Sequence, residues 1–326
     1  MISIYYKNLL VEDEKKLYES FELGLRPMES EIPVQGCTVE QAERVIDALR
    51  YDRPDFFFAD WNHFLLQTRG TDVKVIPAYF YSKEYAVKLL MQLKETAKRI
   101  LRGAAGKSEY ETALYLHDYL ARNCKYVIYE TKERDCFNIL GALLWRQCVC
   151  SGFAHAYKYL CDVADIQCIT VSGHAYGIVG PEGSHAWNII LLDGKMSYVD
   201  VTFDNLETKN YCSHVYFLRS EKRILMDHTP RKEYALPGPL VDRCPLEVIP
   251  SVAQFKKYLR RDFEKGEYTE YLFSSPVESD VFMKEFKESL EVSDIRFLER
   301  IDHYGFPGKG KTESIGVYWK NGPQKK

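Results

Sequence analysis

Residues 147–168, "QCVCSGFAHAYKYLCDVADIQC", hold four cysteines, two of which are separated by a single residue. From Ser151 to Asp165 the apolar residues recur at helical spacing, which predicts a helix that starts directly after Cys150. The free N–H groups and the dipole at a helix N-terminus stabilise a thiolate, and the same groups can hold an oxyanion. The position of Cys150 therefore favours it as a reactive thiol.

The other cysteine chemistries fit this stretch less well. Structural zinc sites usually combine two C-x2-4-C pairs, whereas Cys148 and Cys150 are spaced too tightly, and Cys161 and Cys168 have no partner pair. The chain has 9 cysteines without framework spacing, which suits free thiols in a reducing cytosol better than disulfides. Cys161 lies on the apolar stripe of the helix, so we expect it to be a small buried hydrophobe.

A thiolate nucleophile needs a base, and that base needs an orienting group. Residues 185–192 and 195–201 read as two strands joined by Asp193-Gly194, a typical two-residue hairpin turn. Paired residues then have numbers that sum to 387, which puts His185 and Asp200 on one face as diagonal neighbours. A register slip of one residue would move them to opposite faces. The hairpin therefore predicts His185 as the base and Asp200 as its partner.

Other candidates for these two roles are weaker. His174 lies in a glycine-flanked loop with no carboxylate at a predictable offset. His155 is on the helix of Cys150 but off its face, and Asp204 lies past the end of the strand. The combination of a cysteine at a helix start, a strand histidine and a cross-strand aspartate is more specific than any of these residues alone.

Composition and charge narrow the class of protein. The chain has 326 residues, of which 46% are hydrophobic and 28% charged, as in an ordinary soluble globular protein. The net charge of -3 gives no reason to expect nucleic acid or an anionic membrane as a partner. The N-terminus does not read as a signal peptide, and no apolar run approaches the roughly 20 residues that span a bilayer. We therefore expect a cytoplasmic protein.

The chain divides into four sections by pattern. We expect an N-terminal α/β extension over 1–105, a core over 106–234, a proline-rich linker over 235–250 and a small α+β domain over 251–326. A small sheet is predicted over residues 53–80. Helices are predicted over 8–25, over 38–50 with Thr38 and Gln41 as a capping box, over 82–103, and over the stretch that begins at Ser108. The last domain reads as helix, strand, helix and a terminal hairpin around the loop "GFPGKGK".

At these residues the sequence resembles the transglutaminase-like superfamily, in which Cys, His and Asp follow one another on a papain-related fold. Four pieces carry the resemblance: "HDYL" at 117–120, "CVCSGFAHAYKYLC" at 148–161, "HAWNIILLDGKMSYVDVTFDN" at 185–205 and "VYFLRS" at 215–220. The upstream "YDRPDFFF" and "VIPAYFYS" look like the region that precedes this core in bacterial members. The resemblance implies an α+β protein whose nucleophile helix packs on an antiparallel sheet.

The resemblance also assigns roles to residues. It maps Cys150 onto the nucleophile, His185 onto the general base and acid, and Asp200 onto the group that orients the imidazole. Two positions depart from the common pattern, Cys148 in place of a glycine and Phe203 in place of a tryptophan.

Further residues near this core have a structural interpretation as well as a functional one. Gln147 and Trp145 are nearby candidates for an oxyanion donor, although ordinary loop and packing roles fit them better. Trp187 is a candidate wall of a substrate groove. His117 and Asp118 are expected to pack or cap a helix.

The expected chemistry is acyl transfer through a thioester on Cys150, with a protein or peptide as substrate. Attack by water makes the enzyme a peptidase or amidase, and attack by a lysine amine makes it a transglutaminase; hydrolysis is slightly favoured. The reaction requires no metal and no organic cofactor. The alternatives are a catalytically inactive binding module with this fold and an amidase for a small molecule.

Overall fold

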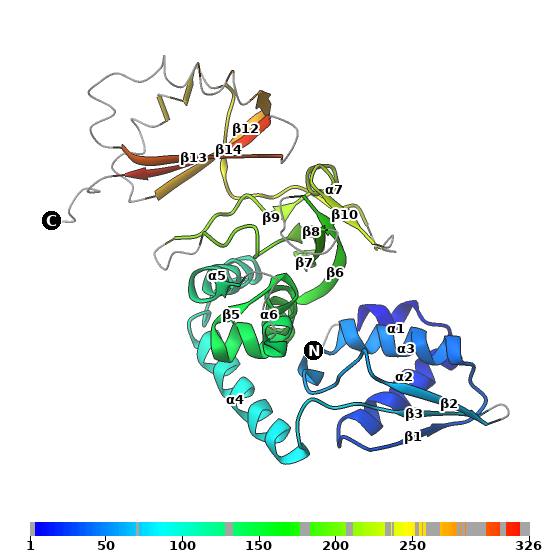
Figure 1. Ribbon diagram of the computed structural model, residues 1–326. Coiled ribbons are helices and arrows are strands. Elements are labelled where there is room, and N and C mark those ends of the chain that lie inside the picture. Colours follow the sequence, from blue (N-terminus) through cyan, green and yellow to red (C-terminus); the bar gives the residue numbers. More distant parts are fainter. Residues whose placement is uncertain are drawn as a thin grey trace.

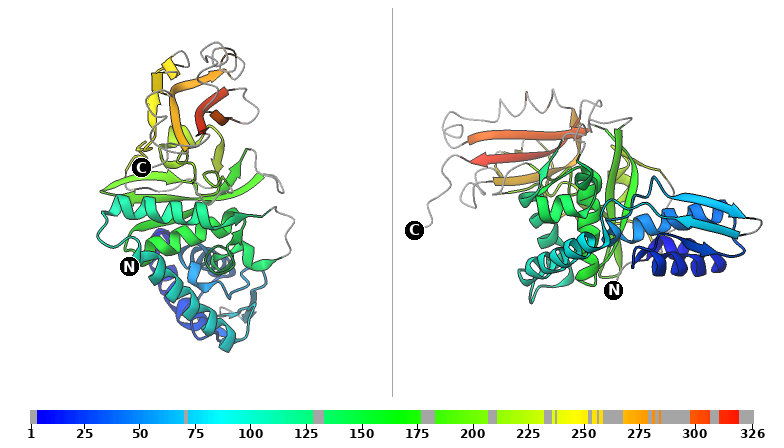
Figure 2. Two further views of the ribbon diagram at one scale, coloured as in Figure 1. Left: turned by 90° about the vertical axis from the view of Figure 1, so that its left-hand side faces the viewer. Right: turned by 60° about the horizontal axis from the view of Figure 1, so that its bottom comes forward.

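The computed structural model describes residues 4–69, 72–127, 133–176, 183–206, 211–231, 236, 238–251, 254–255, 257–258, 268–278, 281, 284, 298–306 and 311–319. Figure 1 shows three successive parts: N-terminal helices with a small sheet, a central core, and a C-terminal sheet. In Figure 2 the N-terminal part and the C-terminal sheet lie on different sides of the core. The core contacts both, since the Tyr6 hydroxyl donates to the Thr170 carbonyl and the Ser213 hydroxyl donates to Glu270.

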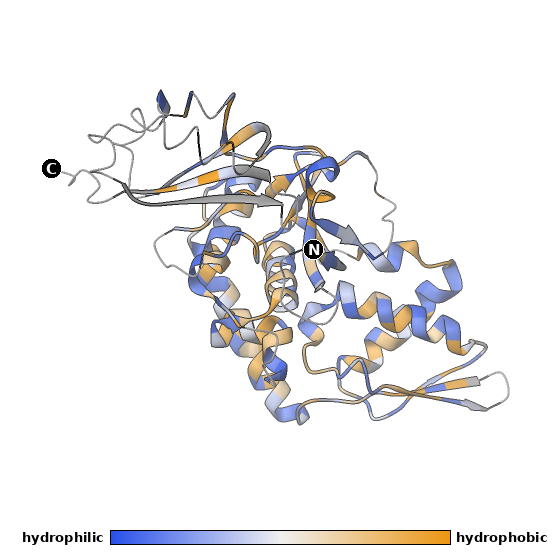
Figure 3. Cartoon of the chain, turned by 45° about the horizontal axis from the view of Figure 1, so that its top comes forward, coloured by the Kyte–Doolittle hydropathy of each residue, from blue (hydrophilic) through white to orange (hydrophobic). Residues whose placement is uncertain are grey.

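The N-terminal part pairs three helices with a three-stranded antiparallel sheet of order β1-β3-β2. Its elements are α1 (Tyr5–Leu9), α2 (Glu12–Leu25), β1 (Ile32–Val34), α3 (Val39–Asp52), the 3-10 turn η1 (Pro54–Phe56), β2 (Leu65–Arg69) and β3 (Asp72–Ile76). The helix expected over 8–25 is thus two helices. Thr38 caps α3 as predicted, because its hydroxyl accepts from the Gln41 N–H while its own N–H donates to the Gln41 side chain. Figure 3 shows these helices with separate hydrophobic and hydrophilic faces.

The core combines helices with a five-stranded antiparallel sheet of order β10-β6-β7-β8-β9. Its helices are α4 (Lys83–Arg102), α5 (Glu109–Asn123), α6 (Cys150–Val163) and α7 (Glu221–Ile224), with short turns η2 (Arg134–Phe137) and η3 (Gly141–Trp145). The sheet strands are β6 (Gln167–Ala175), β7 (Ser184–Leu192), β8 (Lys195–Val199), β9 (Phe217–Arg219) and β10 (His228–Pro230), and β4 (Lys125–Tyr126) pairs separately with β5 (Gln147–Cys148). The α+β core with a helix on an antiparallel sheet is confirmed.

Helix α6 packs against β6 and β7 through its apolar side. Phe153, Tyr157 and Cys161 are fully buried on it, as the periodicity predicted. The Asn188 side chain on β7 donates to the Ala154 carbonyl on α6, at 3.0 Å. This contact and the apolar packing fix the helix relative to the strand that carries His185.

The β7–β8 hairpin has the predicted register. Leu192 pairs with Lys195 and Asn188 with Val199, so the paired numbers sum to 387. Asp193 and Gly194 have φ angles of 50° and 70°, the left-handed conformations of a type I′ turn. The ladder ends at Val199, so Asp200 follows it directly.

The C-terminal sheet has the order β11-β12-β14-β13, with strands β11 (Glu247–Ile249), β12 (Tyr268–Glu278), β13 (Leu298–Phe306) and β14 (Lys311–Trp319). The terminal hairpin β13–β14 is confirmed, whereas residues 307–310 of its loop and most of the two expected helices lie outside the described residues. Within the section expected to be a linker, 235–250, Glu247–Ile249 form β11. Val241 exchanges hydrogen bonds of 2.8 and 2.7 Å with Met196 and Ser197 on β8.

Among the described residues no helix combines the length and the apolar composition needed to cross a membrane.

The turn at Gly194 gives a stability prediction with a matched control. A Cβ at Gly194 would meet nothing within 4 Å, so Gly194→Ala tests the positive φ alone. We expect this substitution to lower the free energy of unfolding by about 1–2 kcal/mol, the cost of a left-handed conformation. Gly238→Ala has equally open surroundings and no positive φ, and it should leave stability unchanged or slightly higher. Equal losses in urea denaturation of the two variants would contradict this account of the turn.

Candidate active site

Cys150 is the first residue of α6 and is nearly buried, with 5% of its surface exposed. The preceding turn η2 holds the start of this helix, since the Val149 N–H and the Ser151 hydroxyl donate to the carbonyls of Cys136 and Phe137, each at 3.0 Å. Gly152 is required for this approach, because a Cβ there would lie 2.6 Å from the Cys136 carbonyl oxygen. The first turn of α6 is therefore fixed in place around the thiol.

His185 lies near the start of β7 with its ring buried. Nε2 is 2.6 Å from Oδ2 of Asp200, whereas Nδ1 makes no hydrogen bond of normal geometry with any described residue. Burial opposes the charged imidazole, but the Asp200 carboxylate and the nearby Cys150 thiol outweigh it and raise the pKa of His185 to about 10. Nδ1 is therefore the ring nitrogen that can exchange a proton with the Cys150 thiol.

Asp200 is a buried carboxylate with contacts on both oxygens. Oδ1 accepts from the N–H groups of Thr202 and Phe203, at 2.9 and 3.3 Å. Burial would raise the pKa of this carboxyl group, but His185 and His228 on Oδ2 hold it well below its usual range. Asp200 is therefore ionised and can hold the His185 ring in one orientation.

The sequence reasoning missed His228, which lies on β10. Its Nε2 is 3.0 Å from the same Oδ2 of Asp200, and its Nδ1 is 2.5 Å from Oδ1 of Asp227. The Tyr216 hydroxyl donates to the other oxygen of Asp227, at 2.5 Å. Burial lowers the pKa of His228, but Asp200 and Asp227 outweigh it and raise the pKa. His228 therefore belongs to the shell that holds Asp200.

The other residues that the sequence singled out near the site differ in burial and in contacts. Trp187 is fully buried, and its ring stacks on that of His185 with centroids 5.7 Å apart. Gln147 is exposed on β5, and its assignment as an oxyanion donor stays a prediction. The indole N–H of Trp145 donates to Asp135, at 3.0 Å. Trp187 thus supports the imidazole plane from within the core.

Cys148 differs from Cys150 although only one residue separates them. Its thiol is fully buried, with Sγ 3.3 Å from Sγ of Cys124. Burial, reinforced by the Cys124 neighbour, raises the pKa of Cys148 well above its ordinary value. A thiolate is therefore disfavoured at Cys148.

A cleft of about 440 Å³ opens beside the start of α6. Ser151 and Asn138 line it from the core, and Arg50, Trp61 and Phe80 line it from the N-terminal part and the segment that follows. The cleft places aromatic and guanidinium groups next to the residue that follows Cys150. Cys150, His185 and Asp200 are not among the residues that line it.

A protein-family model matches the part of the chain that carries this site. Residues 94–202, which include Cys150, His185 and Asp200, match the model of the transglutaminase-like superfamily. The core of this chain is transglutaminase-like. The match begins within α4, before the boundary expected at residue 106; the expected domain limits stay predictions.

Two curated proteins and one solved structure are similar to parts of the chain. Kyphoscoliosis peptidase of Mus musculus is 26% identical over 154 residues, which cover 42% of this chain and 23% of that protein. The Homo sapiens protein of the same name is 29% identical over 115 residues, 31% of this chain and 17% of that protein. The crystal structure of a TGase has a TM-score of 0.31 and 11% identity, over 68% of this chain and 57% of that one. The chain thus spans about a fifth of the length of these curated relatives.

The pKa of His185 gives a prediction with a clear sign. Because its folded pKa lies above 6.5, its stabilising contribution is fully present below pH 6.5 and is lost as pH rises through about 10. Asp200→Asn removes the largest of the causes that raise the pKa of His185, so the pKa should fall well below its wild-type value of about 10. Imidazole NMR titration, with His185→Gln for assignment, measures the difference.

Asp227→Asn is the matched control for that titration. Its carboxylate contacts His228 and not His185, so the His185 signal should titrate close to the wild-type pH. A His185 signal that titrates at the same pH in wild type and Asp200→Asn would contradict the arrangement.

Proposed function

We propose that this protein is a cysteine-nucleophile acyl-transfer enzyme that acts on peptide or glutamine carboxamide groups. The observation that carries the proposal is the His185 imidazole, hydrogen-bonded through Nε2 to Asp200 at 2.6 Å while Cys150 lies close enough to affect its pKa. Cys150 occupies the start of α6, where backbone N–H groups face the site. Nucleophile, base and orienting group thus come together from three separate segments.

The reaction follows from this arrangement in two steps. The Cys150 thiolate adds to the carbonyl carbon, and the oxyanion that forms is stabilised by N–H groups at the start of α6. The C–N bond then breaks, His185 gives its proton to the departing amine, and a thioester remains on Cys150. His185 next takes a proton from the second substrate, which attacks the thioester and releases Cys150.

The identity of the second substrate separates two activities. Water gives a carboxylic acid and makes the protein a peptidase or amidase, whereas a lysine amine gives a new amide bond and makes it a transglutaminase. We favour hydrolysis, which the name of the similar kyphoscoliosis peptidases also supports. We assign the peptide to the cleft beside Ser151, whose lining combines aromatic rings with the Arg50 and Arg134 guanidinium groups.

Alkylation of Cys150 tests the thiolate–imidazole pair. Iodoacetamide should modify Cys150 faster than the other cysteines of the chain, because the charged His185 favours a neighbouring thiolate. His185→Ala should slow this reaction, whereas His174→Ala, at an exposed position of β6, should not. Mass spectrometry of the labelled peptides locates the site. Labelling spread evenly over several cysteines, or labelling of Cys150 at the same rate in His185→Ala, would overturn the proposal.

The partition between water and amine is measured with one glutamine-containing protein substrate and a fluorescent primary amine. Hydrolysis predicts new peptide ends or deamidated glutamines without fluorescent product, and transamidation predicts incorporation of the amine. Either product should disappear in Cys150→Ala. Turnover that persists in Cys150→Ala would exclude this nucleophile, and partner binding without turnover in both proteins would instead favour a binding module.

A further inference from the structure

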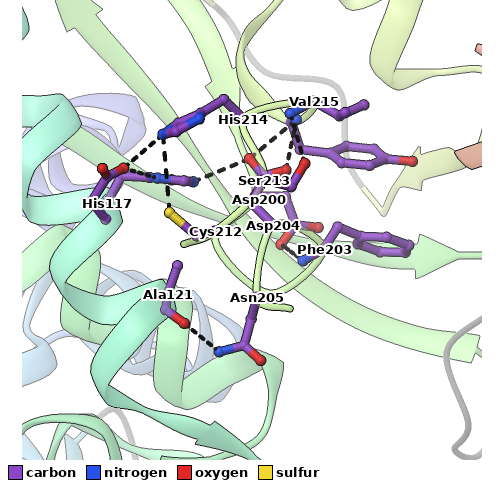
Figure 4. Close-up of polar contacts among 12 residues, drawn as sticks. His117, Ala121, Asp200, Phe203, Asp204, Asn205, Cys212, Ser213, His214 and Val215 are labelled. Carbon is purple, nitrogen blue, oxygen red and sulfur yellow. Dashed lines mark hydrogen bonds and ion pairs between the residues drawn. The ribbon is translucent and has the colours of Figure 1, made fainter. Parts of the chain in front are cut away.

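A second cluster of titratable side chains lies between α5 and the segment before β9, and the proposed acyl transfer does not use it. It consists of His117 and Asp118 on α5 with Cys212 and His214 on the facing segment. Figure 4 shows Cys212 and His214 directed towards His117 across the space between these elements. Imidazole nitrogen, thiol sulfur and carboxylate oxygen are the ligand atoms that zinc takes from proteins.

The spacing of these four residues suits one ion. One ligand atom from each can be chosen so that all lie within 4.8 Å of one another. Oδ1 of Asp118 is 3.1 Å from Nδ1 of His117 and 2.8 Å from Nε2 of His214, and Sγ of Cys212 is 4.0 Å from the same Nε2. Tetrahedral zinc with Zn–N of about 2.0–2.1 Å and Zn–S of about 2.3 Å holds its ligands about 3.3–3.6 Å apart. The observed distances fall on both sides of that range.

The surrounding residues orient the ligands. Nε2 of His117 is 3.1 Å from Oδ2 of Asp204, a fully buried carboxylate, which leaves Nδ1 facing the cluster. The other oxygen of Asp118 accepts from Arg122, at 3.0 Å. A histidine whose second nitrogen donates to a carboxylate, and a ligand carboxylate that is itself hydrogen-bonded, are the usual supports of protein metal sites.

The thiol of Cys212 is buried beside a cavity. It is 1% exposed, and Cys212 and His214 both line a cavity of about 470 Å³. An ion can therefore reach the cluster from this cavity.

We propose that His117, Asp118, Cys212 and His214 bind one zinc ion in a structural site. The ion joins α5 to the segment that leads into β9, and through His117 and Asp204 it supports the turn that begins at Asp200. All four coordination positions come from protein side chains, as in zinc sites that stabilise folds and perform no catalysis. This inference does not depend on the proposed acyl transfer.

Cobalt binding tests the site directly, because thiolate-bound Co²⁺ gives a sulfur-to-cobalt charge-transfer band in the near ultraviolet and strong visible bands when tetrahedral. All proteins are full-length and carry Cys150→Ala, so that the reactive thiol cannot supply the sulfur. The parent should bind one Co²⁺ per chain with this band, and Zn²⁺ should displace it. Added Cys212→Ser should abolish the band, whereas Cys37→Ser, a buried cysteine of the N-terminal part, should not.

A second variant keeps the test decisive if Cys212→Ser fails to fold by circular dichroism. His214 is partly exposed, so His214→Gln disturbs packing less, and it should weaken Co²⁺ binding by at least the tenfold to hundredfold typical of a lost supporting contact. Chelator should lower the melting temperature of the zinc-loaded parent and leave that of His214→Gln unchanged. A parent without the charge-transfer band, or a band that survives Cys212→Ser in a folded protein, overturns the site.

Discussion

The buried carboxylate of Asp200 is the group around which the core is organised. A buried charge is tolerated only when it is paired and hydrogen-bonded, and here two imidazoles share Oδ2 while two backbone N–H groups occupy Oδ1. These contacts draw together the ends of β7 and β8, the following turn and β10. The orientation of His185, and with it the direction of Nδ1, follows from satisfying this one carboxylate.

The parts of the site that could be predicted rest on short-range rules. A two-residue turn at Asp193-Gly194 fixes the register of its hairpin, and that register brought His185 and Asp200 to one face, as the structure confirms. Helical periodicity likewise located the start of α6 to within one residue, since the predicted helix begins at Ser151 and α6 begins at Cys150. Both inferences need only residues that are close in sequence, where the geometry of turns and helices leaves few alternatives.

His228 and the four proposed zinc ligands escaped prediction for the opposite reason. His228 reaches Asp200 because β10 pairs with β6, and no local sequence pattern predicts that pairing. His117 and Cys212 are brought together by the packing of α5 against a segment almost a hundred residues later, so their spacing resembles no zinc motif. The strand β11 within the expected linker shows the same limit, since its partner β12 lies beyond it in the chain.

Asp204 connects the two clusters physically. Its N–H donates to the Asp200 carbonyl, at 3.3 Å, and its carboxylate accepts from the Tyr216 N–H and contacts His117. The turn 200–204 is held at both ends, which leaves fewer conformations in which Asp200 separates from His185. Fixing His117 in place therefore favours the hydrogen bond between His185 and Asp200. If the proposed ion binds, its stabilisation and the orientation of His185 are therefore linked through one turn of five residues, 200–204, and each favours the other.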